Sequence, residues 1–278
     1  RWLDQEGIET AVLFPTVSGT INRIQEPDYA IALARACNNH FAQDYCARSP
    51  RLRPVGVLPL RDPQAAAAEL RRAVTELGLI SFELLTVGLP LALGDPYYHP
   101  IYAEAERLGV PLCIHGSRSY SWEVGGDKLK TFADVHCYAF TATVLLHFTS
   151  IFSNGVPALF PKLRLAFLEI GATWLPYYLD RLDEHWEKRG KHEMPNLPRK
   201  PSEIFRESDI CVTLEAEEGL LPQTIDYLGD SHFMYATDMP HWDSEFPENL
   251  HELIERPDLS EETKRKLLYD NAKRFYGL

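Results

Sequence analysis

Short apolar runs recur along the chain and alternate with amphipathic stretches. Each run is hydrophobic at consecutive positions, which is typical of strands buried on both faces of a parallel sheet. The stretches between them carry helical spacing, and Pro27-Asp28 and Asp62-Pro63 are start signals for two of the helices. The pattern predicts strands at residues 10–16, 54–60, 78–85, 111–115, 163–168, 210–215 and 233–237, and helices at residues 29–47, 64–77, 102–108, 136–152, 174–188, 221–228 and 260–274.

The alternation of strands and helices predicts parallel β/α units. A closed barrel of this kind needs eight strands. We therefore predict an α/β fold, a (β/α)8 TIM barrel whose first β unit is missing from these residues, in a single domain spanning residues 1–278. An open doubly wound sheet is the alternative, but it usually carries a glycine-rich turn after its first strand, and none is visible here.

Residues 231–243, SHFMYATDMPHWD, end a predicted strand in a cluster of polar groups. Packing of the strand requires none of Asp238, His241 and Asp243. Barrels of parallel strands carry their active sites at the carboxyl ends of the strands. The stretch therefore predicts a functional site at that end. Residues 116–134, with a Gly125-Gly126 breaker, form a long irregular segment of the kind that is often functional.

Composition narrows the classes of function. The formal net charge of -12 argues against a nucleic-acid partner or an anionic membrane, because phosphate binding needs clustered Lys and Arg. No apolar run approaches the ~20 residues of a membrane span, and the opening RWLDQEGIET lacks the pattern of a signal peptide. We expect a cytoplasmic protein. Its five cysteines are an odd number and widely spaced, so a disulfide framework is not expected.

Several longer stretches resemble the amidohydrolase-related family of metal-dependent hydrolases, which includes the aminocarboxymuconate semialdehyde decarboxylase-like proteins. Their order and spacing cover nearly the whole chain. They are VLFPT, LGDPYYHPIYAEAERLGVPLCIHG, FPKLRLAFLEIGATWLPYYLDRLDEHW, YATDMPHWD and DNAKRFYGL. The resemblance implies one or two divalent metal ions (Fe, Zn or Mn), a small-molecule substrate and a homodimer.

Matched by position, His115 corresponds to the family's metal ligand on strand five and Asp238 to its ligand on strand eight. The family's His-x-His pair is absent from the 278 residues, as expected if the first strand is missing. Glu169, in FLEIG, stands where the family often has a His. One branch with this replacement includes a thioester-hydrolysing enzyme that uses two irons. The resemblance therefore implies that His115, Asp238 and Glu169 bind metal.

Each ligand also has a simpler interpretation. His115 would suit a core histidine bonded to backbone, and Asp238 a helix cap. Glu169 follows a buried run, where an uncompensated charge is costly, so it must be paired, protonated or metal-bound. Glu83 and Glu215 also end apolar runs and either face the barrel mouth or pair with a cation.

Further candidates surround the predicted mouth. His241 is a candidate proton shuttle, and with Asp238 and Glu169 it completes the predicted catalytic set. Side chains that could hold an aromatic or carboxylated substrate are Arg118, Trp122, His136, Tyr138 and Trp242, with loop packing as the alternative for each.

We predict a metal-dependent hydrolase that uses metal-activated water to cleave an ester, thioester or amide-type bond of a small carboxylic substrate. The alternative within the same family is non-oxidative decarboxylation of an aromatic or unsaturated acid. We weigh that alternative lower because the family's decarboxylases carry a His where this chain has Glu169. A catalytically inactive barrel that binds a ligand or partner is a third possibility, and metal content separates it from the enzymes.

Overall fold

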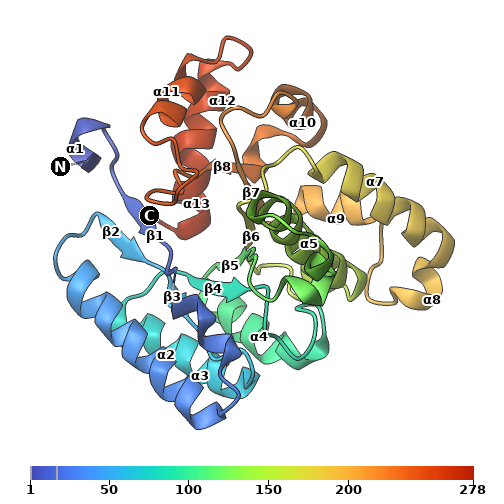
Figure 1. Ribbon diagram of the computed structural model, residues 1–278. Coiled ribbons are helices and arrows are strands. Elements are labelled where there is room, and N and C mark those ends of the chain that lie inside the picture. The colour runs from blue at the N-terminus through green and yellow to red at the C-terminus, as the bar shows by residue number, and fades with distance from the viewer. Residues whose placement is uncertain (1, 17) are drawn as a thin grey trace.

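The computed structural model describes residues 2–16 and 18–278. Every strand pairing in it is parallel, and the strands form a two-stranded and a six-stranded sheet in which strands that are consecutive in the sequence lie beside each other (Figure 1). This order places a crossover between each pair of neighbours, as in β/α barrels. The strands are β1 (Ala11–Leu13), β2 (Leu52–Pro54), β3 (Gly56–Val57), β4 (Phe82–Leu85), β5 (Leu112–His115), β6 (Leu165–Leu168), β7 (Ile210–Leu214) and β8 (Phe233–Tyr235).

Segments β2 and β3 act as one strand that changes partner at Val55. The Val55 amide donates to the Leu13 carbonyl of β1 (2.8 Å), whereas the next amide, that of Gly56, donates to Ser81 (2.9 Å) beside β4. The described residues therefore place strands at all seven predicted positions. Val12 of β1 packs against the same interior cluster as Met234 of β8, so the two ends of the sheet curl around a shared core.

Helices follow the strands and cover the outside of the sheet (Figure 1). The α-helices are α1 (Trp2–Gln5), α2 (Pro27–Phe41), α3 (Pro63–Leu77), α4 (His99–Leu108), α5 (Phe132–Ser153), α6 (Val156–Leu159), α7 (Leu175–His185), α8 (Lys191–Glu193), α9 (Pro201–Glu207), α10 (Leu221–Leu228), α11 (Glu248–Glu255), α12 (Glu261–Arg265) and α13 (Asn271–Tyr276). Short 3-10 and π-helical segments are η1 (Ser18–Arg23), η2 (Ala42–Cys46), η3 (Pro96–Tyr98), η4 (Ser121–Val124), η5 (Gly126–Lys128), η6 (Trp186–Gly190), η7 (Asp230–His232) and η8 (Lys266–Asp270).

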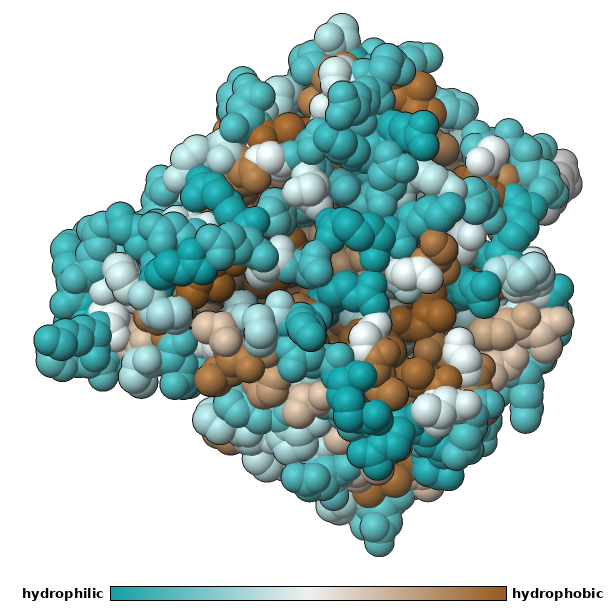
Figure 2. Space-filling view, turned by 180° about the vertical axis from the view of Figure 1, so that it is seen from behind, coloured by the Kyte–Doolittle hydropathy of each residue, from teal (hydrophilic) through white to brown (hydrophobic). Residues whose placement is uncertain are grey.

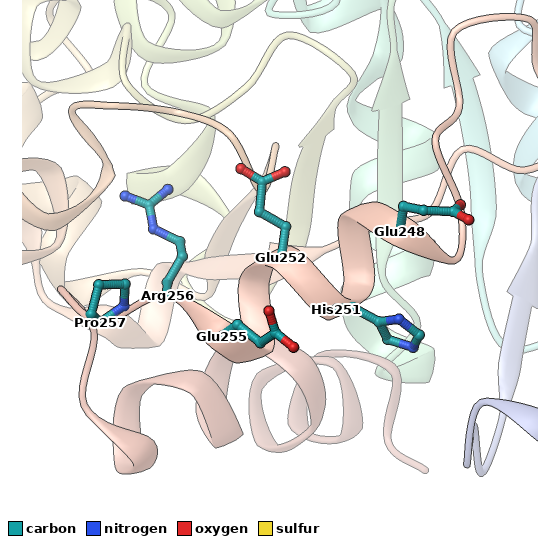
Figure 3. Close-up of a pocket in the computed structure, with 6 residues that line it drawn as sticks. All are labelled: Glu248, His251, Glu252, Glu255, Arg256 and Pro257. Carbon is teal, nitrogen blue, oxygen red and sulfur yellow. The ribbon is translucent and has the colours of Figure 1, made fainter.

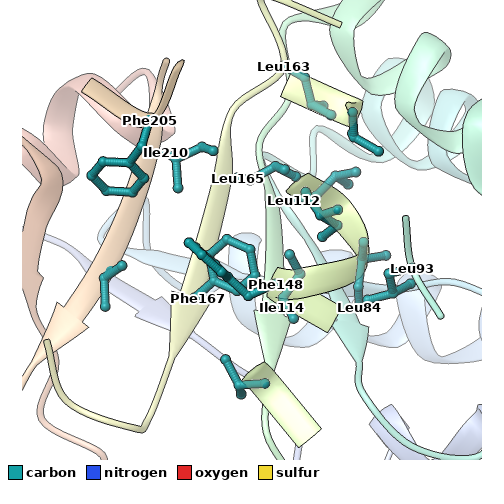
Figure 4. Packing of buried hydrophobic residues seen from close by; sticks show 14 of the residues in the cluster. Leu84, Leu93, Leu112, Ile114, Phe148, Leu163, Leu165, Phe167, Phe205 and Ile210 are labelled. Carbon is teal, nitrogen blue, oxygen red and sulfur yellow. The ribbon is translucent and has the colours of Figure 1, made fainter. Parts of the chain in front are cut away.

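The side chains of each strand alternate between two cores, because successive residues of a strand point to opposite faces. On the outer face, Leu112, Ile114 and Phe167 pack with Phe148 of α5, whose ring centroid lies 4.9 Å from that of Phe167 (Figure 4). The inner face carries smaller side chains, among them Cys113, Ala166 and Cys211. The barrel interior is therefore packed, and the polar site lies beyond it, at the carboxyl ends of the strands.

Helix α5 corrects one expectation from the sequence. Its 22 residues are long and apolar enough to span a membrane by length and composition alone, although no such run was predicted. In the fold, Phe148, Ile151 and Phe152 of α5 are fully buried against the sheet and its neighbouring helices. Contacts with the barrel thus account for one side of α5, whereas Phe132, Tyr138 and Leu146 of the same helix are exposed.

The surface is mostly hydrophilic, in keeping with the charged composition, but hydrophobic residues gather in places on it (Figure 2). Several large apolar side chains are exposed on the segments that follow β5 and β8. They are Trp122, Phe132, Tyr138, Met239 and Trp242. These segments border the carboxyl ends of the strands, where the candidate site lies.

Candidate active site

The carboxyl ends of three strands, β5, β6 and β8, bring the predicted metal ligands together. His115 is the last residue of β5, Glu169 directly follows β6, and Asp238 lies just beyond β8. In the register of the sheet, His115 pairs with Leu168, the residue before Glu169. The carboxyl ends of the parallel strands therefore place these side chains at one mouth of the barrel.

His115 is oriented by hydrogen bonds on both ring nitrogens. Nδ1–H donates to the Gly116 carbonyl (2.7 Å), and Nε2 lies 2.9 Å from Glu169 Oε1. Burial lowers the pKa of His115, but the hydrogen bond to Glu169 and the charges of Glu169 and Glu83 outweigh it and raise the pKa to about 9. With Nδ1 held by a carbonyl, Nε2 is the nitrogen that is free to bind a metal once deprotonated.

Asp238 forms the other side of the cluster. Burial and the charge of Glu169 raise the pKa of Asp238 to about 7. His241 Nδ1 lies 2.7 Å from Asp238 Oδ1 and opposes this shift. For Glu169, burial is outweighed by the hydrogen bond and charge of His115, so its pKa lies below the usual value. The cluster thus contains one ionised carboxylate and one that shares a proton near neutral pH.

The backbone is strained at two of these residues. Glu169 (φ 63°) and Asp238 (φ 48°) both adopt the left-handed conformation that favours glycine. Glu169 is held by a hydrogen bond from its amide to Thr213 Oγ1 of β7 (3.0 Å). Strain of this kind is concentrated at functional sites, where side-chain chemistry outweighs backbone preference.

Glu83 lies beneath the cluster on β4. It is fully buried, and its Oε2 atom has no hydrogen-bond partner in the described part of the chain. Burial raises the pKa of Glu83 to about 7, with His115 opposing the shift and Glu169 adding to it. A buried carboxylate beside further acids is the environment that a bound cation would stabilise.

The donor set fits a divalent metal ion. Ligand atoms of Glu169, Asp238 and His241 lie within 4.8 Å of one another, and His115 Nε2 contacts the same Glu169 carboxylate. Imidazole nitrogen and carboxylate oxygen suit Zn, Fe and Mn. His115, Glu169, Asp238 and His241 are therefore the residues that could hold the ion.

Loop positions around the cluster are fixed by Glu218. Its carboxylate accepts hydrogen bonds from the amides of Ala172 (2.8 Å), Thr173 (2.9 Å) and Glu215 (3.1 Å). This ties the loop after β6 to the loop after β7. Burial and the surrounding acids raise the pKa of Glu215 to about 8.

A cavity of about 310 Å³ opens beside the cluster. Its lining combines the acids with one side of α5: His136, Cys137, Phe140, Thr141, Glu169, Ile170, Gly171, Glu215 and Glu218. A larger hollow of about 460 Å³ lies on the outside of α11. Its side chains, among them Glu252, Glu255 and His251, point in different directions and do not converge on a common point (Figure 3). The cavity beside Glu169 is therefore the candidate active site.

The predicted substrate-binding residues occupy different positions. His136 lines the cavity, and the Trp242 ring lies 5.6 Å from it. Arg118 stacks over Phe132 (4.8 Å), a neighbour of both rings. Trp122 packs on Tyr120 (4.3 Å) and Tyr138 donates to the Val124 carbonyl (2.8 Å), and neither lines this cavity.

Sequence reasoning missed Phe140 and Glu218 of the lining. Phe140 follows His136 by four residues, which on a helix places both on one face, and this spacing could have identified it. Glu218 gave no signal, because an acid in a surface loop has nothing in the sequence to mark its backbone partners.

Comparison with known proteins identifies the family. Residues 3–278 match the family model described as Amidohydrolase. The chain is 28% identical over 290 residues to gamma-resorcylate decarboxylase of Rhodococcus jostii RHA1, covering all of this chain and 86% of the relative. It is also 28% identical over 278 residues to 2-amino-3-carboxymuconate-6-semialdehyde decarboxylase of Dictyostelium discoideum, covering 99% of this chain and 75% of the relative.

The crystal structure of a dihydroxybenzoic acid decarboxylase from Polaromonas sp. JS666, solved with bound manganese and the inhibitor 2-nitroresorcinol, has a similar fold. The TM-score is 0.82 at 25% identity, over 99% of this chain and 84% of that one. This similarity confirms the predicted TIM barrel.

The comparisons correct the predicted reaction. Hydrolysis was wrong as the main prediction, because these relatives are decarboxylases, and they support the alternative instead. The prediction ranked decarboxylation lower because Glu169 replaces a His of the family's decarboxylases, and that ranking was wrong. The predicted family is confirmed, since its model covers nearly the whole chain: this protein belongs to the amidohydrolase family and is an enzyme of the amidohydrolase superfamily.

Proposed function

We propose that this protein is a metal-dependent, non-oxidative decarboxylase of a small aromatic or unsaturated carboxylic acid. The observation that carries the proposal is the partly buried cluster of His115, Glu169, Asp238 and His241 beside a cavity at the barrel mouth. The proposal is also supported by two relatives that are named decarboxylases and by a similar structure that contains manganese.

The cluster would hold a divalent ion through His115, Glu169, Asp238 and His241, with manganese, zinc and iron all suited to these donors. When bound, the ion supplies positive charge that attracts the substrate carboxylate and stabilises negative charge during bond cleavage. Glu83, buried below, adds negative charge that favours retention of a cation.

The chain's own residues would then supply a proton. In decarboxylation the carboxyl group leaves as CO2, the electron pair of the broken bond stays on the substrate carbon, and that carbon takes up one proton. Asp238 and His241 form the acid–base pair of the cluster, and one of the two would hold the proton and pass it to that carbon. His241 Nδ1, 2.7 Å from Asp238 Oδ1, provides the contact through which the proton passes between them.

Product analysis in D2O tests this proposal. Manganese-loaded protein is incubated with carboxyl-labelled hydroxybenzoates and related unsaturated acids. We expect labelled CO2 and one deuterium on the carbon that lost it, with turnover reduced at least about a hundredfold in Asp238→Asn. Glu217→Gln, an exposed acid on a neighbouring loop, is the matched control. Absence of CO2 from the whole panel would contradict the proposal.

A further inference from the structure

The ring of His136 is held in one orientation by three aromatic neighbours. Phe132 and Phe140 lie one turn before and after it on α5, with ring centroids 5.4 Å and 4.5 Å away and interplanar angles of 26° and 31°. Trp242, from the loop after β8, meets the His136 ring edge-on at 5.6 Å. His136 is thus fixed between stacked rings while it lines the cavity beside Glu169.

This orientation turns Nε2 of His136 toward a carboxylate of another loop. Nε2 lies 3.9 Å from Asp243 Oδ2, which is too far for a direct hydrogen bond. One oxygen placed to the side of that line can bond to both atoms at normal distances. Both side chains are partly exposed, 26% for His136 and 36% for Asp243, so a ligand can reach them.

We propose that His136 and Asp243 recognise a hydroxyl group on the ring of the substrate. The hydroxyl oxygen accepts from His136 Nε2–H, and its proton is donated to Asp243 Oδ2. Such a group matches both partners at once, whereas an ether oxygen lacks the proton for Asp243 and a carboxylate is repelled by it. Phe140 and Trp242 provide apolar surface for the ring that carries the hydroxyl.

This inference rests on the proposed function, because it places an aromatic acid in the cavity beside the metal-binding cluster. In this inference, His136 and Asp243 determine which hydroxylated substrate binds. The metal-binding cluster carries out the bond cleavage. A hydrogen bond to a charged group contributes about ten- to a hundredfold in affinity, which is the discrimination expected here.

Binding measurements on ring isomers test the assignment. Dissociation constants of benzoate and of its 2-, 3- and 4-hydroxy derivatives are measured by calorimetry on manganese-loaded protein. At least one of these hydroxyl groups should tighten binding about ten- to a hundredfold relative to benzoate, the parent compound. His136→Phe preserves the stacking with Phe132 and Phe140, and Asp243→Asn preserves the shape of the loop. Both variants should lose the gain and keep the affinity for the parent compound.

Glu245→Gln, which removes an exposed charge from the same loop, is the control that should keep the gain. Wild-type protein that shows no gain for any isomer, or a gain that survives in either variant, would overturn the assignment. Release of CO2 is scored separately. A gain lost in both variants without any CO2 release would support the pair and contradict the decarboxylase proposal, and CO2 release with an unchanged gain would do the reverse.

Discussion

Two acidic residues of the site have a strained backbone conformation. Glu169 and Asp238 lie at positive φ, at 63° and 48°, on loops that follow buried strands. A glycine would relieve this strain at either place. A side chain with metal-binding chemistry stands there instead, which is why strain and function coincide at these residues.

The cost of that strain is measurable at Glu169. We expect Glu169→Gly to be more stable than Glu169→Ala by about 1–2 kcal/mol in the free energy of unfolding, because only glycine adopts this conformation without a steric penalty. Urea denaturation of the two metal-free variants makes the comparison, since neither variant retains the carboxylate.

Glu184, a partly exposed residue of α7, provides the opposite control. In a helix, glycine is about 1 kcal/mol less favourable than alanine, so Glu184→Gly should be less stable than Glu184→Ala. Equal stabilities of the two Glu169 variants would contradict the strain.

How far these residues were predictable depends on their surroundings in the sequence. Glu169 was identified through the family resemblance, and because a carboxylate next to a buried apolar run needs compensation. Asp238 and His241 were identified because they crowd the end of a strand. Asp243 attracted attention for the same reason, but its approach to His136 depends on two loops meeting, which no local pattern encodes.

At the scale of secondary-structure elements, Glu218 connects the loop after β6 to the loop after β7 through its hydrogen bonds. Replacement of Glu218 by Gln removes the charge and one of the two acceptor oxygens that bind Ala172, Thr173 and Glu215. We expect a loss of about 2 kcal/mol in the free energy of unfolding, together with a raised KM, because Glu169 lies at the start of the tied loop.

Denaturation and steady-state kinetics of Glu218→Gln are compared with Glu217→Gln, a neighbouring exposed acid. If both substitutions have the same small effect, Glu218 does not organise the site.

Helix α5 is joined to the loop after β4 by buried His147. Its Nδ1 accepts from the Leu93 amide (3.0 Å), and Nε2–H donates to the Thr86 carbonyl (2.8 Å). Burial lowers the pKa of His147 to about 4, with the bond to Thr86 opposing the shift. The histidine is thus neutral in the folded protein at pH values where it is protonated in the unfolded chain.

This difference predicts a pH-dependent stability. The folded pKa lies below the unfolded value near 6.5, so the contribution is complete above pH 6.5 and is lost as the pH falls toward 4, by about 3 kcal/mol. Unfolding free energies of wild type and His147→Gln are measured across this range. The wild type should lose stability relative to the variant as the pH falls, whereas parallel curves would show that His147 does not titrate in this way.

Strands and helices with a clear pattern of apolar residues could be predicted from the sequence. Those that depend on tertiary contacts could not. All seven strand positions follow from apolar runs. Helices α9 (Pro201–Glu207) and α11 (Glu248–Glu255) fall outside the predicted helices, although Leu250 and Leu253 of α11 are buried at helical spacing. The start signal Pro27-Asp28 is confirmed, since Glu26 caps α2 and the helix begins at Pro27.

Across the whole molecule, the parallel sheet explains why distant residues form one site. Each strand ends at the same mouth, so His115, Glu169 and Asp238 meet although they are far apart in the sequence. The predicted barrel is confirmed by the similar structure. The reaction could not be read from the ligands, because one metal site of nitrogen and oxygen donors supports both hydrolysis and decarboxylation.

The most direct test of the account is the metal content of the purified protein after reconstitution with Mn²⁺, measured by elemental analysis in wild type, His115→Gln and Glu169→Gln. We expect one to two equivalents per chain in the wild type, because the cluster offers four converging donors, and a clear loss in both variants. Glu217→Gln should match the wild type. Wild-type protein without bound metal, or variants with an unchanged content, would contradict the assignment of this cluster as the metal centre.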